Sequence, residues 1–119
     1  MIKHTAWTLI LVTMIIFLSS CTILVEHIDK NTHFSEQVSS IESAIRSESW
    51  EQANESLSAA KKAWKRLKPV IQIDIDHDYI HVIEDNIAEL KAYIDTKQKP
   101  DALAKVLLIQ ETWEDIGGF

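Results

Sequence analysis

Apolar residues recur at steps of three and four along most of the chain after residue 33. This spacing places them on one face of an α-helix, where neighbouring helices can bury them. Four such stripes follow one another, the last broken at Gln110: Phe34, Val38, Ile41 and Ile45; Trp50, Ala53, Leu57, Ala60, Trp64 and Leu67; Ile80, Ile83, Ile87, Leu90 and Ile94; and Leu103, Val106 or Leu107, and Trp113. The pattern predicts an all-α fold, in which an N-terminal apolar helix is followed by a small antiparallel bundle of about four helices.

Several residues between the stripes signal where helices begin and end. Ser49 fits the N-cap of the second helix, with its hydroxyl covering backbone N–H groups as in a capping box. Pro69 lacks a backbone donor and is expected to stop or kink that helix. Asp74 or Asp76 can cap the third helix, and Pro100 suits the first turn of the fourth. Because the connections are short, consecutive helices are predicted to be antiparallel neighbours.

The first 25 residues are almost without charge. Lys3 is the only fully charged side chain before Glu26, and Thr5–Val25 would span about 31 Å as a helix at roughly 1.5 Å per residue. That length matches the hydrocarbon core of a bilayer, but a positive start and an apolar run also fit a signal peptide. We therefore predict two parts: residues 1–25 as a signal peptide or membrane anchor, and residues 26–119 as a helical domain.

The only cysteine, Cys21, lies near the end of this apolar segment. Leu18, Ser19 and Ser20 precede it in the manner of a bacterial lipobox, in which small residues fit a narrow peptidase site and the thiol receives a diacylglyceryl group. The alternative is an uncleaved anchor helix in which Cys21 is one more small apolar side chain. Two hypotheses therefore stand, lipid attachment at Cys21 after cleavage and a single membrane-spanning helix.

Both hypotheses place the helical domain at the outer face of the cell membrane. Lys3 precedes the apolar run and acidic residues follow it, an arrangement that favours an N-terminus inside the cell. An unpaired thiol also fits an oxidising exterior when it is modified. We expect contact with membrane lipid and a membrane protein as partner, since tethering raises the local concentration of two bound molecules.

The charge of the chain excludes one class of partner. The formal net charge is −6, and removing residues 1–20, which takes away only Lys3, makes it −7. Such a surface repels phosphate backbones, so we expect no binding of nucleic acid. A single cysteine also leaves no internal disulfide and no metal site built from several thiols.

Three tryptophans are candidates either for the core or for contact with a partner: Trp50, Trp64 and Trp113. Bulky aromatic side chains supply much of the buried surface of a small domain, which favours the core. The second helix also carries a basic run made of Lys61, Lys62, Lys65, Arg66 and Lys68. These side chains either form a solvated helix face or lie against anionic lipid headgroups.

The stretch "DIDHDYIHVIED" is the richest in groups that can carry chemistry. His77, His81 and Glu84 are spaced at i, i+4 and i+7, so they share one face of a helix and could bind a transition metal. Flanking aspartates would raise the pKa of the histidines and favour a pH-responsive site. In the alternative interpretation His77 borders the core, His81 is solvated and no metal binds.

Catalysis has little support in the sequence. The serines are plentiful but lie on predicted helices, without the strained turn that exposes a nucleophile. We expect no enzyme and no cofactor. The first hypothesis for function is a membrane-tethered accessory or interaction module, and the second is a metal- or pH-sensing domain that uses His77, His81 and Glu84.

Several fixed points in the helical pattern resemble the domain-of-unknown-function 4363 family of Firmicutes. They are Trp50 and Trp64 on the second helix, the Asp-His-Asp segment at 76–78, the run from Leu90 to Ile94, and Ala102-Leu103 in the last helix. The resemblance covers most of the chain after the apolar segment. It implies a small, helical, membrane-associated protein with no established activity.

Two residues relate differently to the pattern of that family. Its members usually have a plain apolar anchor, so a lipobox cysteine at Cys21 is a departure. The resemblance implies a histidine beside acidic residues at His77, whereas His81 matches nothing in the pattern.

Overall fold

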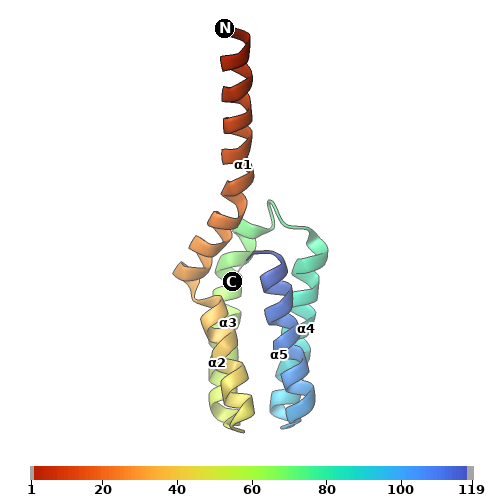
Figure 1. Cartoon of the computed structure of the whole chain (residues 1–119). Coiled ribbons are helices and arrows are strands. Elements are labelled where there is room, and N and C mark those ends of the chain that lie inside the picture. The colour runs from red at the N-terminus through yellow and green to blue at the C-terminus, as the bar shows by residue number, and fades with distance from the viewer. Residues whose placement is uncertain (1, 118–119) are drawn as a thin grey trace.

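The computed structural model describes the backbone of residues 2–117 and the side chains of residues 5–16, 27, 29, 30 and 32–117. The described chain is all-α, without strands, as the apolar stripes predict. It contains five helices: α1 (Ile2–Thr32), α2 (Phe34–Arg46), α3 (Trp50–Ile71), α4 (His77–Asp95) and α5 (Lys99–Asp115). The last four form a bundle, and α1 extends from one end of it, which gives an elongated molecule of 69 × 23 × 22 Å (Figure 1).

The bundle is made of two helical hairpins. One joins α2 to α3 through residues 47–49, and the other joins α4 to α5 through residues 96–98. Both turns lie at the end of the bundle opposite α1 (Figure 1). The hairpins pack together through α2 against α5 and, less extensively, through α3 against α4.

The two hairpin turns use the same backbone chemistry. Glu48 and Lys97 both adopt the left-handed conformation, with φ of 56° and 54°. In each turn two backbone N–H groups bond back to the end of the preceding helix, at 2.8–3.1 Å, in the pattern of a Schellman motif. The hydroxyls of Ser47 and Thr96 also donate to carbonyl oxygens four residues earlier. These bonds satisfy the carbonyl groups that every helix leaves unpaired at its C-terminus.

The predicted helix ends are partly confirmed. Asp76 caps α4, because its carboxylate accepts a hydrogen bond from the backbone N–H of Asp78 at 3.2 Å. Ser49 does occupy the N-cap of α3, but the predicted capping bond is wrong, since its hydroxyl lies against that of Ser47 instead. Pro69 does not stop α3, which continues for two residues because Ile71 is buried in the core.

The core lies between the four bundle helices and is built from the predicted apolar stripes. At its α1 end Phe34, Trp64 and Trp113 form an aromatic cluster, with ring centroids 4.9–6.3 Å apart. These rings come from α2, α3 and α5, so one cluster ties three helices together. Such pairs contribute about 0.5–1.5 kcal/mol each beyond the burial of their area.

A buried carboxylate joins α1 to the bundle. Asp29 is 7% exposed, and it accepts hydrogen bonds from the backbone N–H and the hydroxyl of Ser35 in the first turn of α2. Between the two helices His33 takes a left-handed conformation, with φ of 59°. Asp29 therefore caps α2 from the preceding helix, where a negative charge also complements the helix dipole.

The side chains of α1 that are described from Thr5 to Ile16 are all exposed, and most of them are apolar. Trp7 leaves 72% of its surface uncovered. Within the described residues, no helix is both long enough and apolar enough to cross a membrane.

Candidate functional site

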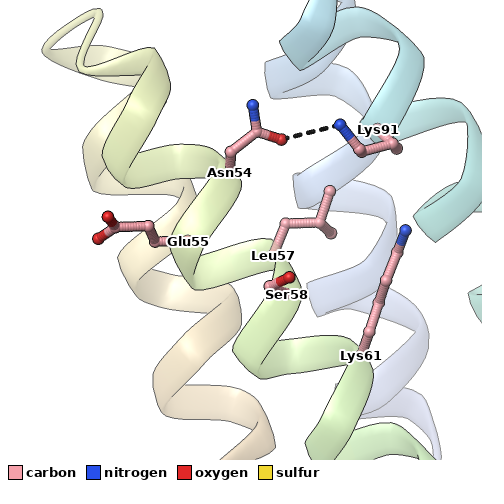
Figure 2. A pocket seen from close by; sticks show the side chains of 6 residues that line it. All are labelled: Asn54, Glu55, Leu57, Ser58, Lys61 and Lys91. Atoms are coloured by element: carbon pink, nitrogen blue, oxygen red, sulfur yellow. Dashed lines mark hydrogen bonds between the residues drawn. The ribbon is translucent and has the colours of Figure 1, made fainter.

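The seam between α3 and α4 contains two of the hollows on the bundle surface. One is a pocket of about 480 Å³, whose lining residues are drawn in Figure 2: Asn54, Glu55, Leu57, Ser58, Lys61 and Lys91. The other, about 390 Å³, is lined by Lys61, Trp64, Lys65, Lys68, Glu84 and Ile87. Lys61 lines both, so the two hollows adjoin along the seam where one hairpin meets the other.

A polar bridge crosses the seam in the first hollow. The ammonium group of Lys91 donates to the amide oxygen of Asn54 at 3.1 Å, as the dashed line in Figure 2 marks. The same ammonium pairs with Asp95, and the amide nitrogen of Asn54 donates to Asp95 at 3.4 Å. The hydrogen bond from Lys91 is the main cause that lowers the pKa of Asp95.

A second bridge lies in the other hollow and is centred on Glu84. Its carboxylate accepts hydrogen bonds from the indole nitrogen of Trp64 at 3.1 Å and from Lys68 at 2.6 Å. The bond from Lys68 is the largest cause that lowers the pKa of Glu84, and partial burial opposes it. The carboxylate is therefore ionised at neutral pH and acts as a hydrogen-bond acceptor between the helices.

The residues predicted to bind a metal lie on α4, but they are not gathered into one site. His77 and His81 are exposed, and the carboxylate of Glu84 is bonded to Trp64 and Lys68. Among the residues with described side chains, no group of three or more histidine, cysteine, aspartate or glutamate side chains could hold a metal ion.

The three candidate tryptophans have different environments. Trp113 is fully buried and Trp64 is 5% exposed, and both belong to the aromatic cluster. Trp50 is partly buried and packs against the edge of the core. None of the three tryptophans is among the exposed large apolar side chains of the described residues.

The predicted lipid-attachment residue, Cys21, belongs to α1. Its side chain lies outside the described residues.

The basic run of α3 divides between two faces of the helix. Lys61 and Lys68 line the seam, where Lys68 pairs with Glu84. Lys62 and Arg66 are exposed and line a different hollow, of about 350 Å³, beside the end of α1. Lys65 is also exposed, at the edge of the seam.

The bridging role of Glu84 was not foreseen from the sequence. Trp64 and Lys68 are four residues apart and so share a face of α3, which is a visible signal for a common acceptor. Nothing in the sequence places that face against α4. The cap that Asp29 provides for α2 was missed because this residue lies within α1, before the left-handed His33.

Comparison with known proteins gives a family but no characterised relative. No curated protein matches the chain, and no solved structure matches it. A family model described as a domain of unknown function matches residues 18–117, which covers the last part of α1 and the whole bundle. The chain belongs to the DUF4363 family.

Proposed function

We propose that the chain is a membrane-tethered, extracytoplasmic helical module that acts by contact with another protein. In this proposal α1 holds the bundle at the outer face of the cell membrane, and the bundle presents side chains to a membrane protein. The proposal treats the module as non-enzymatic and without a cofactor.

The observation that carries the proposal is the exposed apolar surface of α1. From Trp7 to Ile16 its large apolar side chains project away from the bundle, and each leaves more than half of its surface uncovered. Apolar patches of this kind on a soluble surface mark contact with a membrane or with another protein. Since Thr5–Val25 carries no charge, a bilayer is the surroundings that suit this segment best.

Two modes of tethering fit the same proposal. In one, the peptidase cuts before Cys21 and the cysteine carries the lipid. In the other, residues 5–25 remain as a single span. Lys3 before the segment and Glu26 after it favour the same orientation in both modes.

The second hairpin also exposes apolar side chains that a partner could contact. Tyr79 and Val82 on α4, and Leu107 and Leu108 on α5, each leave 41–43% of their surface uncovered. Interfaces between proteins are enriched in such apolar and aromatic side chains at their centre.

The test of tethering is fractionation of the full chain expressed in a bacterium. We expect it to stay with membranes after alkaline carbonate washing, and an Ile10→Asp/Ile15→Asp variant to move to the soluble fraction, because charges in a bilayer core cost about 2.5–3.5 kcal/mol each. A Lys97→Asp/Lys99→Asp variant, changed at the far end of the bundle, serves as control and should stay bound. Wild-type chain released by the wash would contradict the proposal.

Two further measurements refine the test. The mass of the mature chain distinguishes the modes, because an N-terminus intact at Met1 excludes lipid attachment and a Cys21→Ala variant should then behave like the wild type. A photo-crosslinking residue placed at Val82 should capture one membrane protein, whereas the same residue at Glu111 should not.

A further inference from the structure

One exposed stripe of α3 changes from basic to apolar as it approaches the α1 end of the bundle. Lys62, Arg66 and Val70 follow one another at steps of four, and therefore share a face of the helix. Ile73 lies two residues after the helix and leaves 78% of its surface uncovered, the most of any large apolar side chain that the structure describes. Val70 leaves 41% uncovered.

This stripe lies next to the place where α1 leaves the bundle. Lys62 and Arg66 share the hollow of about 350 Å³ with Thr32, the last residue of α1, and with His33 and Glu36 at the start of α2. The connection from α3 to α4, which carries Ile73, rises on the same end of the bundle as α1, whereas the two hairpin turns lie at the opposite end (Figure 1). A membrane that holds α1 therefore faces this stripe.

The cations of the stripe are available for a partner. Lys62 and Arg66 are exposed, and no ion pair reaches them within the part of the chain that the structure describes. Three carboxylates lie close by in the sequence and oppose an anionic surface: Asp74, Asp76 and Asp78. The carboxylate of Asp76 already caps α4.

We propose that this end of the bundle docks on the surface of the membrane that holds α1. Val70 and Ile73 lie at the boundary between headgroups and acyl chains, and Lys62 and Arg66 bind the phosphates of anionic lipids. Amphipathic surfaces bind membranes through this combination of buried apolar area and basic side chains. The inference rests on the proposed tethering and adds to it a fixed orientation of the bundle against the lipid.

The test measures the depth of a probe in vesicles that carry the full chain. A fluorescent label is attached at Gln72→Cys in a Cys21→Ser background, which leaves Ile73 in place. The vesicles contain phosphatidylcholine and phosphatidylglycerol at 3:1, with a lipid that bears a nitroxide quencher at headgroup level. We expect strong quenching at position 72 and none at a label on Glu51→Cys, near the opposite end of the bundle.

Matched charge variants then test the role of the cations. Lys62→Gln/Arg66→Gln should lower the ratio of docked to undocked bundle roughly 25-fold, since each basic residue near an anionic surface contributes about a fivefold factor. Lys97→Gln/Lys99→Gln removes the same charge at the far end and should leave the ratio unchanged. Ile73→Asp should abolish quenching while the helical circular dichroism is retained.

The possible results separate the two proposals. Flotation of the vesicles is measured on the same samples, in which Cys21→Ser leaves the apolar segment as the tether. A chain that does not float overturns both the single membrane span and the docking. A chain that floats without quenching at position 72 overturns the docking alone. Equal quenching in vesicles of pure phosphatidylcholine, or after Lys62→Gln/Arg66→Gln, overturns the assignment of these cations to lipid phosphates.

Discussion

The carboxylate of Glu84 accepts hydrogen bonds from two side chains of the neighbouring helix, Trp64 and Lys68. Tryptophan offers one N–H donor, which needs a partner when the ring is buried, and Trp64 is almost fully buried. Glu84, at the edge of the bundle, therefore accepts the hydrogen bond that the buried indole of Trp64 donates. At this scale the chemistry is structural, since it holds one hairpin against the other.

The ionisation of Glu84 should make part of the stability depend on pH. The pKa of Glu84 is lowered from its ordinary value of 4.5, mainly by the bond from Lys68. Its contribution is therefore complete above that value and is lost as the pH falls through the lower pKa of the folded state. We expect Glu84→Gln to reduce the free energy of unfolding at pH 7 by about 1 kcal/mol, and the difference from wild type to shrink toward pH 3.

Denaturant unfolding of both proteins at a series of pH values checks this expectation. Glu55→Gln, a change at an exposed carboxylate, should show no comparable dependence on pH. A difference between wild type and Glu84→Gln that is the same at pH 7 and pH 3 would mean that the ionised form has no special role.

At the scale of elements, the apolar stripes predict all four bundle helices, because burial of one face decides where a helix forms. They do not predict the helix ends with the same accuracy. Pro69 predicts a stop or a kink in α3, but the helix does not stop there, because burial of Ile71 outweighs the lost hydrogen bond. The left-handed turns at Glu48 and Lys97 carry no sequence signal, because the glycine that usually marks such a position is absent.

Replacing Glu48 by glycine should stabilise the first hairpin. A residue with a side chain costs roughly 1–2 kcal/mol in the left-handed conformation, and glycine avoids this cost. Part of the gain is offset, because glycine makes the unfolded chain more flexible. We expect Glu48→Gly to raise the free energy of unfolding by about 0.5–1 kcal/mol, measured by denaturant titration. Glu55→Gly, at an exposed position inside α3, should lower it by about 1 kcal/mol. A loss of stability in Glu48→Gly would contradict the proposed cost at this turn.

At the scale of the whole molecule, the aromatic cluster connects both hairpins, since Phe34 and Trp64 come from the first and Trp113 from the second. The sequence predicts that each ring belongs to the core, but it does not predict that the three rings contact one another. The break in the last stripe at Gln110 has a physical reason, because its amide donates to Glu42 on α2 at 2.8 Å. The seam between α3 and α4, and the position of the stripe of Lys62, Arg66 and Val70 beside α1, depend on how α3 packs against its neighbours. The local sequence pattern does not predict that packing.

Loss of the Trp113 ring should destabilise the entire bundle. The side chain is fully buried, and truncation of such a residue to alanine costs about 3–5 kcal/mol. That is a large part of the 5–15 kcal/mol that stabilises a typical domain. We expect Trp113→Ala to lower the thermal midpoint strongly by circular dichroism, and Trp50→Ala, at the edge of the core, to lower it less. Equal effects of the two changes would contradict the central place of the cluster.

The arrangement in two hairpins also determines how the chain reaches its fold. Because α2 packs chiefly against α3 and α4 against α5, most contacts join segments that are near in the sequence. Closing such short loops takes little entropy, and helical bundles of this kind fold within about microseconds to milliseconds. During synthesis, which starts at the N-terminus, the first hairpin is complete as soon as α3 is made. The helices α2 and α3 can therefore pair before α5 is synthesised.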